Sequence, residues 1–440
     1  MKKAVLMISL VAFIVLDGVA VYRFFLRKSI PDAPVSEQVV SILQQNDCFV
    51  CHSRTPKLPF YANFPVIGEQ MGKHVAHAAN FINLEKKMQN PDEVTLSMLD
   101  HAVTYGTMPI KEYKMIHWGT SFNDKEKAVL NDWIQVTRAQ MGVDAFQIIP
   151  ESIPVDTAKV ALGEKLYNDG RLSADGTISC ATCHVLKQGG ADPRGTRTSE
   201  GINGQFGGIN APTVYNAWYN VKQFWNGRAA NLAEQAAGPP TNPIEMGCAS
   251  WDEIVERLRA DKDLVAAFEG AYPGEGITQT TVTGAIAEFE KTLLTPGDSF
   301  DHYLQGEKGA LSAEALAGFD AFQKNACATC HTGVTLGGKS FELLGIYGDY
   351  FAERNADIVY NADDDGLKGF TGNGEDLHRY KVPTLRNVAL TAPYFHDGSQ
   401  ATLEEAVRTM AKYELGKELT DVDVDDLVAF MNSLTGKIKE

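Results

Sequence analysis

The chain has 440 residues, of which 44% are hydrophobic and 22% charged, an ordinary composition for a globular protein of two or three domains. Its formal net charge is -16 at pH 7 and its isoelectric point about 5.1, which argues against nucleic acid as a partner because phosphate binding requires the opposite sign. An acidic surface of this kind either steers a basic redox partner or serves solubility alone.

The first 28 residues form a mostly apolar run that begins after Lys2 and Lys3. Its large apolar residues outweigh the cost of about 2.5–3.5 kcal/mol for placing Asp17 inside a bilayer. The run therefore predicts an uncleaved transmembrane helix, with a signal peptide cleaved near Ala20 as the alternative. Basic residues flank both ends, so they do not orient the segment.

Six of the seven cysteines fall in three C-x-x-C-H runs, each the attachment signature of a c-type haem. In such a site two thiols bond the porphyrin edge and the adjacent His ligates the iron. Three copies, each followed by His, make a redox dithiol or a zinc site a poor explanation. We therefore expect three covalently bound haems, attached at Cys48, Cys51 and His52; Cys180, Cys183 and His184; and Cys327, Cys330 and His331. The seventh, Cys248, is expected to be a buried small residue that ligates nothing.

Helical patterns dominate the segment around the first haem motif. Pro56, Pro59 and Pro65 predict an extended, looped stretch after that motif. Asn123 is the predicted N-cap of a final amphipathic helix. The other expected helices begin near Ser36 and cover 75–88 and 95–103.

A Gly-Thr-Met108-Pro run before the final helix resembles small cytochromes c, in which such a Met is the sixth iron ligand. His/Met ligation suits electron transfer, so Met108 is our preferred ligand. His74 and His77 are alternatives, because the start of this segment also resembles a haem-binding domain family whose distal ligand no motif fixes. His101 and His117 are expected to be ordinary histidines.

The second and third motifs each follow an amphipathic helix, predicted over 157–167 and over 312–322 with Ser312 as the cap of the latter. A helix followed by C-x-x-C-H therefore recurs three times, at irregular distances, as a repeated cytochrome c unit and not as a solenoid. Strong period-two strand patterns are missing, which predicts a mostly α protein with long loops.

Six segments further along the chain carry a more specific resemblance. They are Ile209-Asn-Ala-Pro-Thr213, Phe224-Trp-Asn-Gly-Arg228, Glu234-Gln-Ala-Ala-Gly-Pro239, Glu245-Met246, Val382-Pro-Thr-Leu-Arg-Asn-Val388 and Thr391-Ala-Pro-Tyr-Phe-His-Asp-Gly398. With them, residues from about 150 to 437 resemble the bacterial di-haem cytochrome c peroxidases. The additional N-terminal haem and anchor make the whole chain similar to the tri-haem, membrane-bound members, which include those that oxidise quinols.

The expected architecture is mostly α, with three cytochrome c-like haem domains in tandem preceded by one N-terminal transmembrane helix. We divide the chain into a membrane anchor or signal peptide (1–28), an N-terminal monohaem cytochrome c-like domain (29–145), a peroxidatic haem domain (146–305) and an electron-transfer haem domain (306–440). Covalent haem attachment takes place outside the cytoplasmic membrane for bacterial cytochromes c. The expected location is therefore a single-pass protein of the inner membrane with its haem domains in the periplasm.

The resemblance implies a role for several residues. His184 becomes the proximal ligand of the haem that reacts with peroxide, and His331 that of the electron-transfer haem. Glu245 stands at the position of the distal acid/base, which takes a proton from one peroxide oxygen and returns it to the other. Gln235 orients peroxide or stabilises charge. Trp225 occupies the position between the two haems, where an indole shortens the electron-tunnelling gap and its N–H can hold a haem propionate.

The resemblance also supplies the remaining ligands. Met410 becomes the sixth ligand of the electron-transfer haem; a related group that modifies amine dehydrogenase precursors has Tyr there, so Met410 argues against that activity. A calcium ion between the haems is expected at Asn210, Thr391 and Pro393, which offer a side-chain amide and backbone carbonyls as hard oxygen ligands. The acidic run 363–366 is expected to be a turn.

One departure from the family concerns the resting peroxidatic iron. Many members cap it with a His about sixteen residues past the proximal His, and no His occurs between Val185 and Gln223. We therefore predict an open or water-bound iron in the oxidised protein, with no reductive activation step.

The sequence thus predicts a peroxidase that reduces hydrogen peroxide to water through three c-type haems, with quinol or a cytochrome c as electron donor. The alternative is a non-catalytic multihaem electron-transfer cytochrome, in which all three irons have sixth ligands. The oligomeric state is left open, although a homodimer is common among the resembling proteins.

Overall fold

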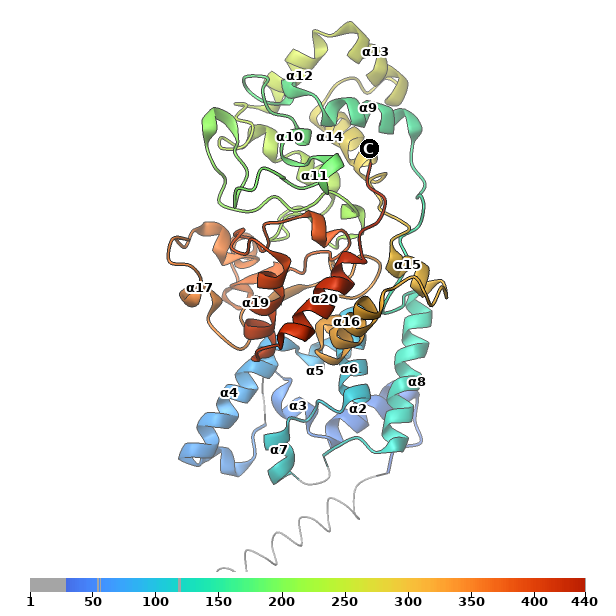
Figure 1. The fold of residues 1–440 in the computed structure, drawn as a ribbon, viewed down its shortest axis with the longest axis vertical. Helices are drawn as coiled ribbons and strands as arrows, with labels where there is room; N and C mark the ends of the chain where they lie inside the picture. The colour runs from blue at the N-terminus through green and yellow to red at the C-terminus, as the bar shows by residue number, and fades with distance from the viewer. Residues whose placement is uncertain (1–28, 54, 56, 118–119, 440) are drawn as a thin grey trace, which may run out of the picture. The chain divides into compact units, whose positions relative to one another are not determined.

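The computed structural model describes residues 29–53, 55, 57–117 and 120–439. They divide into two compact units, of which the first ends at Asp144 and the second begins at Ala145 (Figure 1). Nearly all regular structure is helical, as the sequence predicts.

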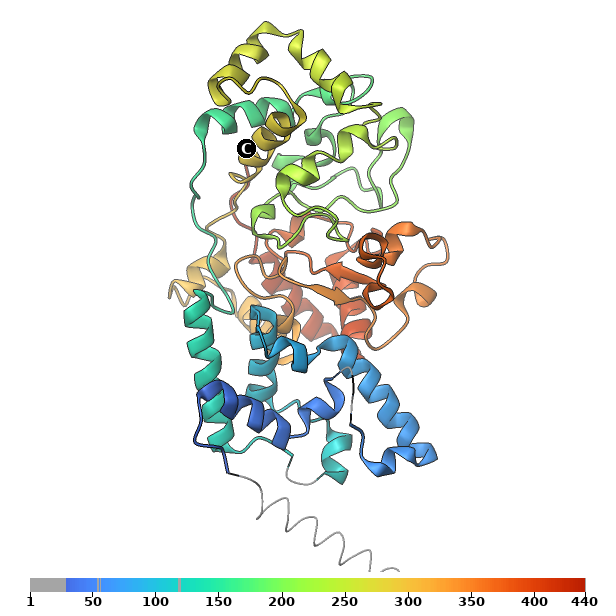
Figure 2. The same ribbon diagram turned by 180° about the vertical axis from the view of Figure 1, so that it is seen from behind.

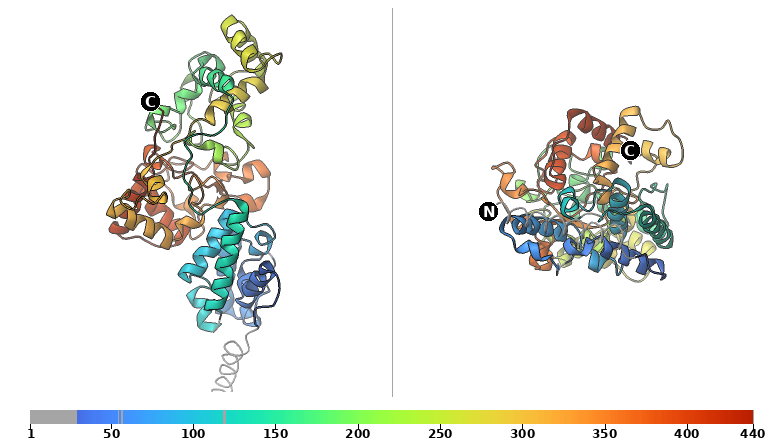
Figure 3. Two further views of the ribbon diagram at one scale, coloured as in Figure 1. Left: turned by 90° about the vertical axis from the view of Figure 1, so that its right-hand side faces the viewer. Right: turned by 90° about the horizontal axis from the view of Figure 1, so that it is seen from below.

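The first unit is a small helical domain built on a long C-terminal helix, α8, against which α2 and α6 pack (Figure 3). Ile42 and Leu96 are fully buried there. Asn123 forms the predicted capping box with Glu126 at the start of α8. The helices are α2 (Val35–Gln45), α3 (Cys48–Cys51), α4 (Pro65–Phe81), α5 (Leu84–Lys87), α6 (Glu93–Tyr105), α7 (Lys111–Ile116) and α8 (Asp124–Met141).

The looped stretch predicted after the first motif is shorter than expected. It ends at Pro65, which is the first residue of α4. Proline suits this position because its ring presets a helical φ and its missing N–H would have no helical partner there. A proline therefore starts a helix where we expected it to extend a loop.

The second unit contains most of the chain and two closely packed helix pairs, α9 with α14 and α16 with α20 (Figure 1). Its helices are α9 (Thr157–Tyr167), α10 (Cys180–Cys183), α11 (Leu232–Ala236), α12 (Trp251–Arg259), α13 (Lys262–Ala271), α14 (Gln279–Glu290), α15 (Ser299–Leu304), α16 (Ala313–Lys324), α17 (Tyr350–Glu353), α18 (Lys368–Thr371), α19 (Leu403–Leu415) and α20 (Asp421–Asn432). Ser312 caps α16, as predicted.

Both helix pairs cross at a glycine. A Cβ atom on Gly163 of α9 would lie 1.9 Å from the carbonyl oxygen of Ala285 in α14. A Cβ atom on Gly318 of α16 would lie 1.9 Å from the carbonyl oxygen of Asp426 in α20. The two crossings are therefore built in the same way, and only glycine permits such a close approach of the backbones.

The similarity of the two halves extends to their loops, in which equivalent residues stand 171 positions apart. Asn216 and Asn387 both adopt a left-handed conformation, and so do Phe224 and Phe395. Isolated antiparallel bridges join residue 223 to 229 and, equivalently, 394 to 400. The second unit is therefore an internal repeat of one haem-binding plan.

Two reciprocal hydrogen bonds join the halves. The N–H of Lys381 donates to the carbonyl of Trp225 at 2.9 Å, and the N–H of Asn210 donates to the carbonyl of His396 at 2.7 Å. Asn210 is equivalent to Lys381, and Trp225 to His396, so the two bonds are related by an approximate twofold operation.

The second unit also contains a short antiparallel pair of strands, β1 (Phe341–Leu343) and β2 (Arg379–Lys381) (Figure 2). Phe341 pairs with Lys381 and Glu342 with Tyr380. Strands of three residues are too short to show an alternating pattern in the sequence, which explains why they were not expected.

Two expectations about the membrane have to be corrected. The fold was expected to begin with one transmembrane helix, and the protein to be single-pass in the inner membrane with its haem domains in the periplasm. None of the helices in the described part of the chain combines the length and the apolar character needed to cross a bilayer. Both expectations fell on residues 1–28, which lie outside the described residues.

Candidate functional site

The first haem motif forms a cradle around His52, which is buried next to the C-terminal end of α4. Its Nδ1 lies 3.2 Å from the carbonyl oxygens of both Ala78 and Ile82. Nδ1 bound as a donor leaves Nε2 without a proton, which is the form that ligates iron. Burial lowers the pKa of His52 and thus favours the neutral ring.

The candidate sixth ligands of this haem differ in how they are held. Met108 is half-buried and follows the left-handed Gly106 that ends α6. His74 lies on α4, as does His77. Nδ1 of His101 lies 3.3 Å from the Thr107 hydroxyl, and Nδ1 of His117 lies 3.1 Å from the Tyr113 carbonyl oxygen.

The second and third motifs repeat the same arrangement. Nδ1 of His184 lies 3.3 Å from the carbonyl of Gly190, and Nδ1 of His331 lies 3.0 Å from that of Leu336. Burial lowers the pKa of both imidazoles. None of the seven cysteines, all of which are described, forms a disulfide, so each motif offers two thiols for thioether bonds. The three motifs therefore fit a covalently bound haem.

Glu245 lies close to the second motif, since its charge acts on the thiol of Cys183. Its Oε1 accepts a hydrogen bond of 2.7 Å from the side chain of Asn242. Burial raises the pKa of Glu245, and Asp363 adds to this, while Arg228 and the bond from Asn242 oppose it. The structure thus places a half-buried carboxyl with a raised pKa beside the haem-attachment site, as is typical of groups that exchange protons in active sites.

Two charged residues near Glu245 were not assigned a role from the sequence. The Arg228 guanidinium stacks 3.4 Å from the centre of the Phe224 ring, and burial lowers its pKa. Asp363, in the acidic turn, acts on both Arg228 and Glu245. Arg228 stands in a recognised motif, but Asp363 is more than a hundred positions away from the others and carries no motif of its own.

Gln235 lies on the short helix α11, capped by Asn231. The loop that carries a His in many family members runs here from Gly201 to Gly208 and is pinned to the Glu245 segment: the N–H of Ile202 donates to the carbonyls of Ile244 and Glu245 at 3.1 and 2.9 Å. A Cβ atom on Gly201 would lie 2.0 Å from the Ile244 carbonyl oxygen. This loop therefore approaches the site with its backbone and brings no imidazole.

Trp225 is half-buried where the two halves of the second unit meet. Its indole N–H donates to the carbonyl of Asn210 at 2.9 Å. Its ring lies 6.5 Å from that of Tyr380 and 6.4 Å from that of His396, both edge-on. The indole is thus fixed by the chain itself, whereas the family resemblance implies a haem propionate as a partner of its N–H.

The three residues expected to hold calcium lie around the same junction. Asn210 is buried, and its N–H donates to the carbonyl of His396, three residues after Pro393. Its side-chain amide donates to the carbonyl of Arg197 at 3.0 Å, which leaves the amide oxygen for another partner. In the described residues, no group of three or more His, Cys, Asp or Glu side chains could hold a metal ion by itself.

Met410 is half-buried on α19, which begins at Leu403 as predicted and extends to Leu415. Cys248 is buried, and its Sγ lies 3.4 Å from the carbonyl oxygen of Leu172, so the expectation of a buried small residue is confirmed.

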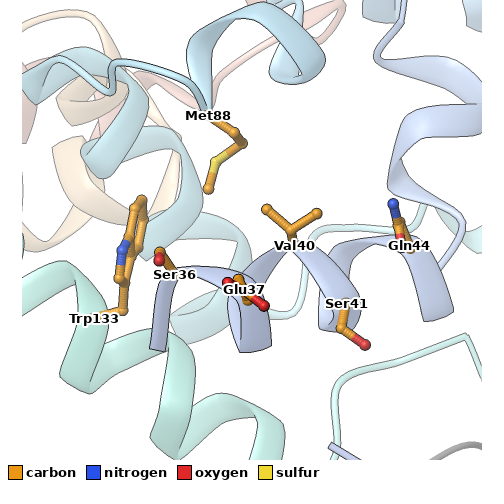
Figure 4. Close-up of a pocket in the computed structure, with 7 residues that line it drawn as sticks. All are labelled: Ser36, Glu37, Val40, Ser41, Gln44, Met88 and Trp133. Atoms are coloured by element: carbon orange, nitrogen blue, oxygen red, sulfur yellow. The ribbon is translucent and has the colours of Figure 1, made fainter. Parts of the chain in front are cut away.

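A pocket of about 380 Å³ lies between α2 and α8 in the first unit. The side chains of Val40 and Met88 point toward each other across it, with Trp133 at one end (Figure 4). None of its lining residues belongs to a haem motif or to the expected ligands, so it forms no part of the candidate site.

Three family models match the chain: a haem-binding domain over residues 25–136, a di-haem cytochrome c peroxidase over 157–309 and a cytochrome c over 315–435. The cytochrome c peroxidase Ccp of Escherichia coli (strain K12) is 44% identical over 421 residues, covering 91% of this chain and 88% of its own length. The chain belongs to the di-haem cytochrome c peroxidase family. It is accordingly a peroxidase that carries haem c.

Other members of the di-haem cytochrome c peroxidase family match about two thirds of the chain. The cytochrome c551 peroxidase of Nitrosomonas europaea is 43% identical over 294 residues, which cover 67% of this chain and 84% of the relative. The crystal structure of a MauG-like protein associated with microbial copper homeostasis superposes with a TM-score of 0.56 and 32% identity, covering 66% of this chain and 93% of that one. The family resemblance inferred from the motifs is thereby confirmed.

Proposed function

We propose that this family member reduces hydrogen peroxide to water at the haem attached to Cys180, Cys183 and His184. The observation that carries the proposal is the carboxyl of Glu245, held near Cys183 with a raised pKa. When bound, the haem would supply the redox chemistry, passing on two electrons from a donor that, with two protons, convert hydrogen peroxide into two waters. Around it, the chain provides the group that moves protons.

In this proposal, Glu245 transfers protons through one of its carboxylate oxygens, Oε2. Asn242 holds Oε1, so Oε2 takes the proton from the peroxide oxygen and returns it to the other oxygen as the O–O bond breaks. Arg228 favours the ionised form of Glu245, which accepts a proton, since its charge lowers the pKa that burial raises. Gln235 orients the peroxide.

The Gly201–Gly208 loop contains no His that could ligate the iron of this haem. Because this loop offers no imidazole, peroxide has access to the oxidised protein without prior reduction. Resting spectra that contain only low-spin haem would contradict this part of the proposal.

In this proposal His52 and Met108 would hold the haem at which electrons enter, and His331 and Met410 would hold the haem that receives them next. Trp225, fixed between the halves of the second unit, would connect that haem with the haem of His184. This gives three haem domains, at 29–145, 146–305 and 306–440. A pyridine haemochrome assay should find three haems per chain, and two when Cys48 and Cys51 are both replaced by Ala.

A calcium ion held by Asn210, Thr391 and Pro393 completes the proposed site. It would fix the turn that Asn210 already contacts through its N–H, and thereby the position of Trp225, whose indole is bound to the Asn210 carbonyl. Removal of the ion with a chelator should slow peroxide turnover, and addition of calcium should restore it.

The names of the relatives favour a cytochrome c as donor, and quinol is the alternative donor. The deciding assay is peroxide-dependent oxidation of a reduced cytochrome c and, separately, of a soluble quinol by the fully oxidised protein. Turnover with either donor identifies it. Silence with both, even after partial reduction, would favour the rival function of an electron-transfer cytochrome.

Replacement of Glu245 tests the chemistry directly. We expect Glu245→Gln to lower kcat for peroxide by about 10²–10⁴-fold, the usual contribution of a general acid–base group. The control is Glu234→Gln, an exposed carboxyl on α11 that accepts only main-chain N–H bonds from Ala230. If both variants turn over at the parent rate, Glu245 is not the proton-transfer group.

A further inference from the structure

Lys381 is a buried lysine at the end of β2. Only 6% of it is exposed. Its ammonium makes no hydrogen bond or ion pair with any residue that the structure describes, whereas its N–H donates to the carbonyl of Trp225. The charged end of this side chain therefore has no counterpart in the described protein.

Such an arrangement is unfavourable in the chain alone. The effective cost of burying an ammonium group is several kcal/mol unless an anion faces it. Burial lowers the pKa of Lys381 to about 8, and no carboxylate of the described chain opposes the shift. At pH 7 the group still carries its proton for most of the time, so the site requires an anion from outside the polypeptide.

The position of Lys381 indicates which anion this is. One residue along the chain, the carbonyl of Val382 accepts a hydrogen bond of 2.7 Å from the N–H of Gly338, in the loop that follows His331. Lys381 therefore lies close to the loop that holds His331 through the carbonyl of Leu336. On β2 its neighbour Tyr380 stacks on His396, so Lys381 projects from the opposite face of the strand. That face also carries Phe341, its partner on β1.

A haem brings two propionate carboxylates. We propose that Lys381 binds a propionate of the haem attached to Cys327, Cys330 and His331, and that its positive charge raises the reduction potential of that haem. Reduction adds one electron to the haem, so a nearby cation stabilises the reduced form more than the oxidised form. This inference rests on haem attachment and not on peroxide turnover.

The internal repeat places the lysine in one half only. The position equivalent to Lys381 is Asn210, whose backbone makes the reciprocal hydrogen bond and whose side-chain amide donates to the carbonyl of Arg197. The same backbone site thus carries a lysine ammonium in one half and, in the other, the side-chain amide to which the proposed calcium ion would bind.

The test is a potentiometric titration of the holoprotein followed by visible spectra, with Lys381→Met and a matched control. Lys339→Met also removes a half-buried lysine, but one whose ammonium already donates to the carbonyl of Tyr219 at 2.8 Å. For Lys381→Met we expect one reduction step to shift so that the ratio of reduced to oxidised haem falls about tenfold at a given potential, which is about 59 mV for one electron. Lys339→Met should leave all steps in place.

Lys381→Arg keeps the charge and should keep the potential close to that of the parent. Lys381→Gln is the second uncharged variant, for use if the Met variant attaches less haem, and should show the same fall. Unchanged potentials in both uncharged variants, or an equal fall in Lys339→Met, would overturn the proposal. Because the measurement is an equilibrium potential, its failure is distinguishable from a failure of peroxidase activity.

Discussion

At the scale of single residues, the protonation of Glu245 depends on two charges that reach it from distant parts of the chain. Arg228 lowers its pKa and Asp363 raises it, on a background of burial that raises it further. The base form of Glu245 is needed to accept the first proton, so peroxide turnover should fall on the acidic side of a pKa that lies above the ordinary range of a glutamate.

Below the pKa of Glu245 the rate falls, and this fall forms the acidic limb of the pH profile. Removal of Arg228 should move the acidic limb to higher pH. Without the cation, the carboxylate of Glu245 is less stable and its pKa rises, so more of the enzyme is protonated at a given pH. We expect Arg228→Met to shift the limb of kcat/KM for peroxide upward by roughly one pH unit, the lower end of the effect of a close opposite charge. The measurement is a pH profile between pH 4 and 9.

Asp363→Asn supplies a control of opposite sign, because removing this anion should move the limb to lower pH. Arg228→Lys keeps the charge and should leave the limb near its original position. Shifts of the same direction in Arg228→Met and Asp363→Asn would mean that packing and not charge controls Glu245.

The residues of the site divide clearly by how well the sequence predicts them. The haem motifs follow from local patterns, and the structure surrounds His52, His184 and His331 with carbonyl acceptors in the same way. Glu245 is assigned only through the resemblance to the family. Asp363 was considered only as an acidic turn, because its relation to Glu245 exists only after the loops fold. The partner of the Trp225 indole, a backbone carbonyl of Asn210, has no side-chain signal at all.

At the scale of elements, the crossing of α9 and α14 depends on Gly163. A Cβ atom there would also lie 2.8 Å from the Cβ of Phe289, so neither helix can accommodate it without moving. We expect Gly163→Ala to lower the free energy of unfolding by about 1–3 kcal/mol or more, as overpacking does. The measurement is the denaturation midpoint of the holoprotein.

The control is Gly270→Ala on α13, where a new Cβ meets nothing within 4 Å. Alanine is about 1 kcal/mol better than glycine within a helix, so this variant should be as stable as the parent or more so. Equal destabilisation by both substitutions would argue against a close backbone contact at Gly163.

The end of α14 contains a buried carboxyl, Glu290, whose pKa is raised by burial to about 8. The unfolded chain ionises this group near its ordinary pKa of about 4.3, while the folded protein keeps it protonated. Stability is therefore lost as the pH rises between these two values. We expect Glu290→Gln to raise the melting temperature at pH 8 and to change it little at pH 4.

Glu288 on the same helix is the matched control. Although burial alone would raise its pKa, the Lys291 ammonium and the N–H of Asp156 hold it below its usual value. Its carboxylate stabilises the fold, so Glu288→Gln should lower the melting temperature at pH 8. A melting temperature of Glu290→Gln that falls at pH 8 would contradict the burial argument.

The helices show what the sequence predicts at this scale. The range 157–167 agrees with α9, and the caps of α8 and α16 were recognised, because capping residues and apolar spacing act locally. The expected loop at Pro65 is wrong, because a proline can either extend a loop or begin a helix, and here it begins α4. The recurring unit of a helix and a C-x-x-C-H motif is predicted from the sequence, and Pro-Thr-x-x-Asn at 212–216 and again at 383–387 extends that repeat into the loops.

At the scale of the whole molecule, the net charge of -16 predicts how a donor is recruited. A basic cytochrome c is attracted over several ångströms, and this attraction is screened by salt, with a Debye length of about 10 Å at 0.1 M and 3 Å at 1 M. We expect kcat/KM for such a donor to fall about tenfold or more between 10 mM and 500 mM salt.

A neutral soluble quinol should show little change over the same range of salt, which makes it the internal comparison. Initial rates with both donors at fixed peroxide give the answer. A cytochrome rate that does not respond to salt would mean that the donor docks without help from the acidic surface.

The two reciprocal hydrogen bonds across the second unit have a consequence for how its sites diverge. The backbone makes the same hydrogen bond on both sides of the junction. Trp225 and His396 therefore occupy equivalent backbone positions, and so do Asn210 and Lys381. Residues at these matching positions differ in their side chains, while the local backbone hydrogen bonds are shared. In this segment, residues 171 positions apart are therefore suited to exchange between the halves. A side chain taken from one haem environment would meet a similar backbone in the other.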